Sequence, residues 1–117
     1  MSEEEQREFW KRFYEALDAG DAETAAALFP DGTEIHLWDG KTFRTQAEFR
    51  AWFVQLRSTS EAAKRKIIKF EVIGNKSFVE VVLKASINGE EKEVFLRHYF
   101  EFEGDKLVRV YVTIKPL

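Results

Sequence analysis

The stretch VFLRHYFEF, residues Val94 to Phe102, decides the fold because apolar and polar side chains alternate along it. Such alternation is typical of a half-buried β-strand. It places His98 on one face together with four apolar residues, Val94, Leu96, Phe100 and Phe102. A buried imidazole needs a hydrogen-bond partner or a ligand. His98 is therefore either a core histidine bonded to a neighbouring polar group or a polar group placed deliberately in an apolar pocket.

Turn signals on both sides of this stretch predict an antiparallel meander. The pairs Gly74-Asn75, Asn88-Gly89 and Gly104-Asp105 suit tight hairpins. They separate strands that we expect over residues 62–73, 78–87, 92–102 and 107–114. The strands at 78–87 and 107–114 also carry alternating apolar residues, so each presents one face to a core.

The predicted strand at 62–73 breaks its own alternation, because Ile67 and Arg65 lie on the opposite parity to Ile68. A β-bulge near Ile67 and Ile68 would turn both apolar sets inward and bend the strand. Arg65 would then point toward the mouth of a cavity. Without the bulge, Arg65 is a solvated residue on the outer face.

Capping boxes mark two helices in the first half of the chain. Ser2 with Glu5 opens a helix that Gly20 ends, and Thr45 with Glu48 opens another. Between them we expect a short helix over 22–29 and a small hairpin with strands at 33–38 and 41–43.

Three polar residues in this half of the chain are candidates for a structural or a functional role. Tyr14 and Asp18 are four residues apart, so they lie on the same side of the first helix. Tyr14 is either a core tyrosine or a functional one, and Asp18 is either an exposed acid or a member of the site. For His36 we favour a half-exposed structural role.

Composition excludes several classes of function. The chain has 117 residues, a net charge of −3 with both signs interspersed, and no cysteine. The charge argues against nucleic-acid and anionic-membrane partners, and the lack of cysteine excludes disulfides and thiolate chemistry. Two histidines without ligand spacing give no metal site. An acidic start and no apolar run of membrane length predict a soluble protein, cytoplasmic when expressed recombinantly.

Three helices followed by a long curved meander describe an α+β cone whose helices pack on a bent sheet around a pocket. Over essentially the whole chain, 1–117, this single-domain pattern resembles the nuclear transport factor 2-like superfamily, which includes ketosteroid isomerases and polyketide cyclases. The natural isomerases pair a tyrosine with two buried acids. No second pocket acid is evident on the strands here, which argues against isomerase chemistry.

Tyr14, Asp18, Arg65 and His98, with regular capping boxes and hairpin turns, resemble de novo designed luciferases of this fold. The resemblance implies a Tyr14–His98 dyad and a second polar pair of Asp18 and Arg65. It also implies the synthetic imidazopyrazinone diphenylterazine as luciferin, dissolved oxygen as co-substrate, and no metal or organic cofactor. We expect a monomer.

Large apolar residues on the inward faces are the expected walls of the pocket: Trp10, Phe13, Leu17, Trp38, Phe49, Trp52, Phe53, Val81, Leu83, Leu96, Phe100, Val110 and Val112. The same walls would serve a small-molecule binding scaffold without catalysis, which is the main alternative. A third reading is an interaction module that uses the outer sheet face.

Overall fold

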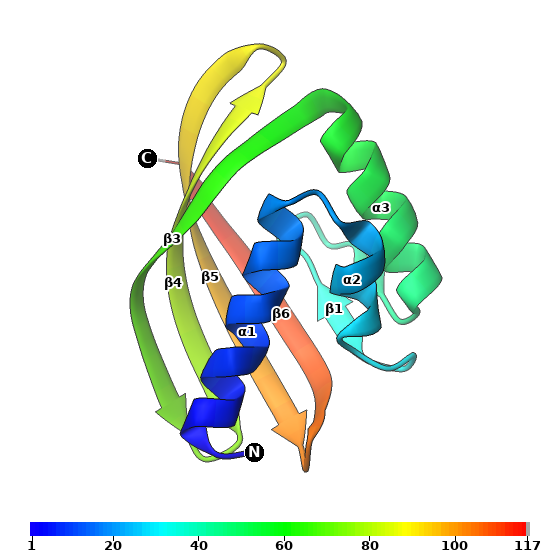
Figure 1. The fold of residues 1–117 in the computed structure, drawn as a ribbon, viewed down its shortest axis with the longest axis vertical. Coiled ribbons are helices and arrows are strands. Elements are labelled where there is room, and N and C mark those ends of the chain that lie inside the picture. The colour runs from blue at the N-terminus through cyan, green and yellow to red at the C-terminus, as the bar shows by residue number, and fades with distance from the viewer. Residues whose placement is uncertain (117) are drawn as a thin grey trace.

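A computed structural model describes residues 1–116, and the side chains of all of these except residues 62, 63 and 116. In this part of the chain three helices pack against the concave side of a six-stranded sheet (Figure 1). The helices are α1 (Glu3–Asp18), α2 (Ala22–Ala27) and α3 (Gln46–Thr59). The strands are β1 (Glu34–His36), β2 (Thr42–Phe43), β3 (Ser60–Ile73), β4 (Lys76–Ile87), β5 (Glu90–Glu103) and β6 (Lys106–Pro116).

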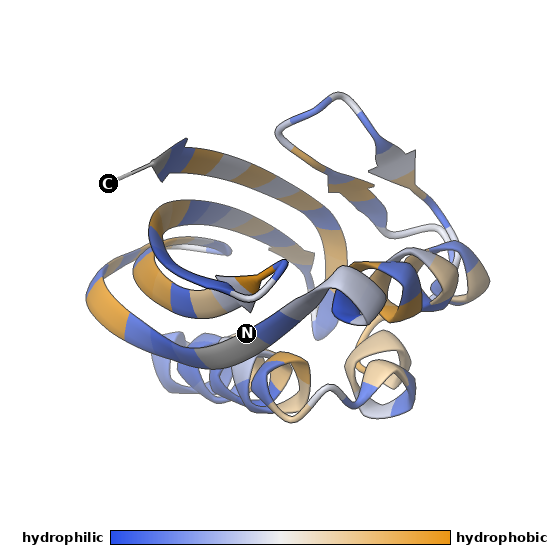
Figure 2. Ribbon diagram, turned by 90° about the horizontal axis from the view of Figure 1, so that it is seen from above, coloured by the Kyte–Doolittle hydropathy of each residue, from blue (hydrophilic) through white to orange (hydrophobic). Residues whose placement is uncertain are grey.

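The sheet has the order β2-β1-β6-β5-β4-β3. Strands β3 to β6 form the predicted antiparallel meander, and β1 joins it by pairing in parallel with β6. Figure 2 shows how strongly the meander curls, so that its inner face wraps around the space that the helices cover. The α+β cone predicted from the sequence is therefore confirmed, with β3 to β6 a few residues longer than expected.

A bulge bends β3 where the alternation of the sequence breaks. The register with β4 shifts between Ile67 and Lys69, as predicted, and a second shift lies between residues 62 and 64. Arg65 pairs with Leu83 and turns inward, leaving 10% of its side chain exposed. The expectation that both apolar sets face inward is wrong at Ile68, which is 54% exposed. Ile68 is the extra residue of the bulge and lies on the outer face, and β3 pairs with β4 again from Lys69 onward.

Helix α1 carries the largest share of the helical core. It begins at the predicted capping box, in which the Ser2 hydroxyl accepts from the Glu5 amide. It ends before Gly20, whose φ of 71° is a conformation that favours glycine. Its buried face packs on the sheet, and each large apolar side chain removed from water contributes about 1.5–3 kcal/mol. The buried residues of α1 are Gln6, Trp10, Phe13, Tyr14, Ala16 and Leu17.

Gln6 is a fully buried polar residue that fixes the start of α1 to the sheet. Its amide nitrogen donates to the Gly74 carbonyl oxygen at 2.7 Å, in the turn between β3 and β4. The Ser77 hydroxyl, also fully buried, donates to the Gln6 side-chain oxygen. These bonds satisfy polar groups that would otherwise be buried without partners.

Gln6→Ala is expected to lower the free energy of unfolding by about 2–4 kcal/mol, because it leaves the Ser77 hydroxyl and the Gly74 carbonyl unsatisfied. Urea unfolding followed by circular dichroism measures the change. Glu8→Ala, an exposed position on the same helix, is the control and should change stability by less than about 0.5 kcal/mol. Equal effects of the two substitutions would contradict the structural role of Gln6.

Candidate functional site

A buried hydrogen bond joins α1 to β5 at the centre of the molecule. The Tyr14 hydroxyl oxygen lies 3.0 Å from Nδ1 of His98, and both side chains are buried. Burial raises the pKa of Tyr14, so the hydroxyl keeps its proton and is able to donate to Nδ1. We therefore assign the neutral tautomer that carries its proton on Nε2, a nitrogen for which the described residues provide no hydrogen-bond partner.

His98 is a neutral imidazole in this site. Burial, and to a lesser extent the positive charge of Arg65, lower the pKa of His98 to about 3. The imidazolium form is disfavoured because its charge would be buried among apolar side chains. His98 is instead a hydrogen-bond donor through Nε2.

Asp18 holds Arg65 by two contacts, one helical turn beyond Tyr14. One carboxylate oxygen accepts from the Arg65 guanidinium at 2.5 Å, and the other accepts from the Arg65 backbone amide at 3.0 Å. Nε of Arg65 is buried and has no hydrogen-bond partner among the described side chains and backbone. The guanidinium thus has a fixed orientation and unused donor capacity, as an anion-binding group requires.

Both pairs adjoin an apolar cavity of about 200 Å³ between the helices and the inner face of the sheet. His98 and Arg65 both line it. Tyr14 and Asp18 do not line it; they contact His98 and Arg65 from α1. Of the expected walls, the structure places these on the cavity: Phe13, Leu17, Trp38, Phe49, Trp52, Phe53, Leu83, Leu96, Val110 and Val112.

Trp10, Val81 and Phe100 do not line the cavity, so the prediction that they form its walls is corrected. All three are almost completely buried in the core. Periodicity identifies the inward face of an element but not the depth of each residue on it. Phe100 stacks on the His98 ring with 5.7 Å between centroids, and Trp10 packs on Tyr14 at 6.3 Å. Phe100 and Trp10 therefore pack against the rings of His98 and Tyr14.

Sequence reasoning missed the polar and small residues at the cavity mouth and part of its apolar lining. The missed residues are Ile35, Leu37, Leu56, Arg57, Thr59, Ser60, Ala85, Ile87, Lys92, Val94 and Ile114. A signal existed for Lys92, because it shares the parity of Val94 and His98 on the inward face of β5. Thr59 and Ser60 lie at the junction of α3 and β3, where no periodicity applies.

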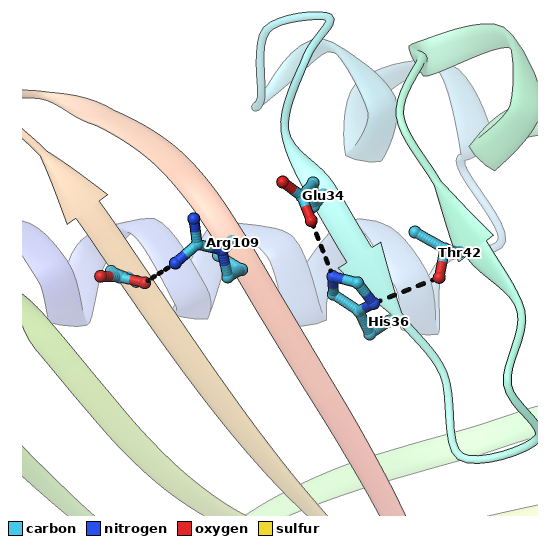
Figure 3. A network of polar contacts seen from close by, with 5 residues as sticks. Glu34, His36, Thr42 and Arg109 are labelled. Carbon is cyan, nitrogen blue, oxygen red and sulfur yellow. Dashed lines mark hydrogen bonds and ion pairs between the residues drawn. The ribbon is translucent and has the colours of Figure 1, made fainter.

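His36 lies on the outer face of the sheet, away from the cavity, in the half-exposed position expected. Its Nε2 lies 3.0 Å from a Glu34 carboxylate oxygen and its Nδ1 3.1 Å from the Thr42 hydroxyl (Figure 3). Its ring stacks on Tyr111 at 4.6 Å. These contacts hold β1, β2 and β6 together, which is a structural role. On the same face Arg109 donates to Glu101 at 2.8 Å.

A second hollow, of about 440 Å³, lies on the outer face. Tyr99, Tyr111 and Phe78 form a row across its strands, between exposed charges such as Arg97. It is the larger space, and His98 is also among its lining residues, but Arg65 and most of the large apolar side chains line only the inner cavity. The inner cavity is therefore the candidate site.

The described residues contain no group of three or more His, Cys, Asp or Glu side chains placed to hold a metal ion. None of their helices is long and apolar enough to cross a membrane.

The sequence profile of SnoaL-like domains matches residues 10–110. The chain belongs to the SnoaL-like domain family. The match runs from the middle of α1 into β6 and thus includes all four polar residues of the site. No curated protein is similar enough in sequence to be matched.

Solved structures share the fold at low sequence identity. A protein with a ketosteroid isomerase-like fold from Catenulispora acidiphila, in complex with trimethylamine, has a TM-score of 0.82 at 14% identity, covering 91% of this chain and 84% of its own. An NTF2-like protein from Burkholderia xenovorans has a TM-score of 0.81 at 18% identity, covering 98% and 92%. An LEH-like epoxide hydrolase from M. tuberculosis has a TM-score of 0.79 at 14% identity, covering 95% and 83%. At these identities the likeness establishes the NTF2-like fold alone.

The lowered pKa of His98 makes stability depend on pH. The unfolded chain binds a proton at His98 near pH 6.5 and the folded protein only near pH 3. The stabilisation that comes from the neutral His98 is therefore present above pH 6.5 and is lost as the pH falls. The free energy of unfolding should decrease by about 2 kcal/mol between pH 7.5 and 5.0. Urea unfolding at both pH values should show this loss in the wild-type protein and not in His98→Phe. His36→Gln is the matched control and should keep it; an identical loss in His98→Phe would contradict a buried neutral His98.

Proposed function

We propose that the protein is a cofactor-free luciferase that oxidises diphenylterazine with molecular oxygen and emits light. The observation that supports this function is the placement of two polar pairs beside one apolar cavity: the buried pair Tyr14–His98 and the partly buried pair Asp18–Arg65. The sequence resemblance to designed luciferases rests on the same four residues. The SnoaL-like fold supplies the pocket, while the reaction is our inference from the site.

In the proposed reaction, all bonds that form or break belong to the luciferin and O₂, and no protein side chain is bonded covalently to the substrate. The imidazopyrazinone ring loses a proton, and the resulting anion gives two electrons to O₂ as a carbon–oxygen bond forms. The peroxide oxygen then attacks the ring carbonyl carbon. The bond from that carbon to the ring nitrogen breaks, the nitrogen keeps its electron pair, and a four-membered peroxide ring results. Cleavage of its O–O and C–C bonds releases CO₂ and leaves the amide product in an excited state. All oxygen atoms come from O₂ and the ring carbonyl, so no redox cofactor is needed.

Stabilising the anion is the task that fits Arg65 and His98. The guanidinium is permanently charged, and Asp18 fixes its orientation, so it supplies a positive charge beside a mainly apolar cavity. The Nε2 proton of His98 can donate to the same anion, with Tyr14 fixing the ring. One charged hydrogen bond contributes about 1.5–3 kcal/mol, or about ten- to a hundredfold in rate.

The ring proton itself cannot rest on His98 in the empty site, given its lowered pKa. A bound anion would raise that pKa, because it favours the imidazolium. The proton that the luciferin ring loses is therefore transferred to solvent at the open end of the cavity. The aromatic walls, among them Phe49, Trp52 and Phe53, hold flat rings and exclude water from the excited product.

Photon counting tests the proposal. Diphenylterazine is added to the protein in air-equilibrated buffer that contains a chelator, and light above the buffer background is expected. His98→Ala should lower the emission about ten- to a hundredfold and Tyr14→Phe about tenfold, because each removes a group that orients or donates to the anion. His36→Gln, the change to the histidine outside the cavity, should leave the emission unchanged.

Emission that survives both substitutions would mean that the shape and dryness of the cavity, rather than the dyad, drive the reaction. A protein that binds the compound but stays dark would contradict the luciferase and identify a binding scaffold.

A further inference from the structure

The charges that line the cavity are all positive, although the chain as a whole carries −3. They are Arg57, Arg65 and Lys92, and no described carboxylate lines the cavity with them. Asp18 pairs with Arg65, and Glu90 with Lys92, from outside the lining. The Glu90 carboxylate lies 3.8 Å from the Lys92 ammonium and is largely exposed, so it offsets little of that charge. The cavity therefore favours negative charge at more than one point.

Lys92 and His98 mark the two ends of this cavity along β5. They lie on the same face of the strand six residues apart, which is about 20 Å. Val94 and Leu96 lie between them and line the cavity. Arg65 is level with Val94, since both pair with Leu83 from neighbouring strands. The positive charges thus extend from the centre of the site to its mouth.

Two of the lining residues, Thr59 and Lys92, are exposed, and they lie where the C-terminal end of α3 adjoins the turn between β4 and β5. The Asn88 amide in that turn donates to the Thr59 carbonyl at 3.1 Å, so we place the mouth of the cavity there. Thr59, Ser60 and Ile87 line it together with Lys92. Pockets for ligands with several rings usually have about 300–1,000 Å³. This cavity has about 200 Å³, so such a ligand extends one end into the mouth. That end comes within reach of the flexible Lys92 side chain.

We propose that the cavity selects flat aromatic ligands that carry an anionic substituent, such as a carboxylate, at the end lying in the mouth. Lys92 is the specificity-determining residue. Arg65 is held by Asp18 and faces the ring system, and the Arg57 guanidinium lies against Gly20 at the end of α1. Lys92, half-exposed and loosely paired, is the cation best placed to move toward a substituent. This inference rests on the proposed function in placing the ligand in this cavity.

The test compares two probes, diphenylterazine and an analogue with a carboxylate on one terminal phenyl ring. Binding is measured without oxygen, through quenching of the fluorescence of Trp38 and Trp52, which line the cavity. The wild-type protein should bind the carboxylate analogue about three- to tenfold more tightly than the neutral probe. Lys92→Gln should abolish this preference, Lys92→Glu should reverse it, and added salt should weaken it.

Lys84→Gln is the matched control. Lys84 is a half-exposed lysine on the neighbouring strand β4, where it pairs with Glu93, and it does not line the cavity. Its removal changes the net charge equally and should leave the preference intact. The role of Lys92 would be contradicted if the wild-type protein bound both probes equally, or if Lys92→Gln kept the preference for the carboxylate analogue. Neither result would contradict the luciferase proposal. Failure of both probes to bind would overturn the two together.

Discussion

The hydrogen bond between Tyr14 and His98 is the constraint on which the site depends. A buried imidazole without a partner would cost about 1–3 kcal/mol, so α1 must place its tyrosine directly over β5. Once this contact is made, helix geometry places Asp18 one turn further along, about 6 Å from Tyr14. Asp18 then meets Arg65 on β3. One helix and two strands thus position both polar pairs.

The backbone prepares this arrangement at two other places. The buried Gln6 fixes the opposite end of α1 to the turn between β3 and β4, so the helix cannot slide along the sheet. The bulge at Ile68 sets the phase of β3 and turns Arg65 inward. The curl of the meander leaves the cavity between sheet and helices. Members of one fold family differ in chemistry according to the groups placed in such a cavity.

The sequence predicted the elements well because their signals are local. Capping boxes at Ser2 and Thr45 and the glycine turns mark where helices and strands begin and end, and alternation identified the inward face of β5. Even the bulge was visible as a break in phase. The parallel pairing of β1 with β6 joins segments far apart in the chain, and no local pattern encodes it.

The missed parts of the site depend on depth and environment. Gln6 stands among charged residues that predict an exposed turn of helix, yet it is fully buried. Val81 and Phe100 share the inward faces of the cavity walls but lie deeper. The pKa of His98 is lowered mainly by burial. The degree of burial depends on the packing of residues far apart in the chain, which local sequence patterns do not predict.

The hydrogen bond between Tyr14 and His98 is tested best by the nitrogen NMR spectrum of the His98 ring in the ligand-free protein between pH 5 and 8. We expect one neutral tautomer throughout, with the proton on Nε2 and Nδ1 accepting from Tyr14. A ring that titrates near pH 6.5, or that carries its proton on Nδ1, would contradict this arrangement.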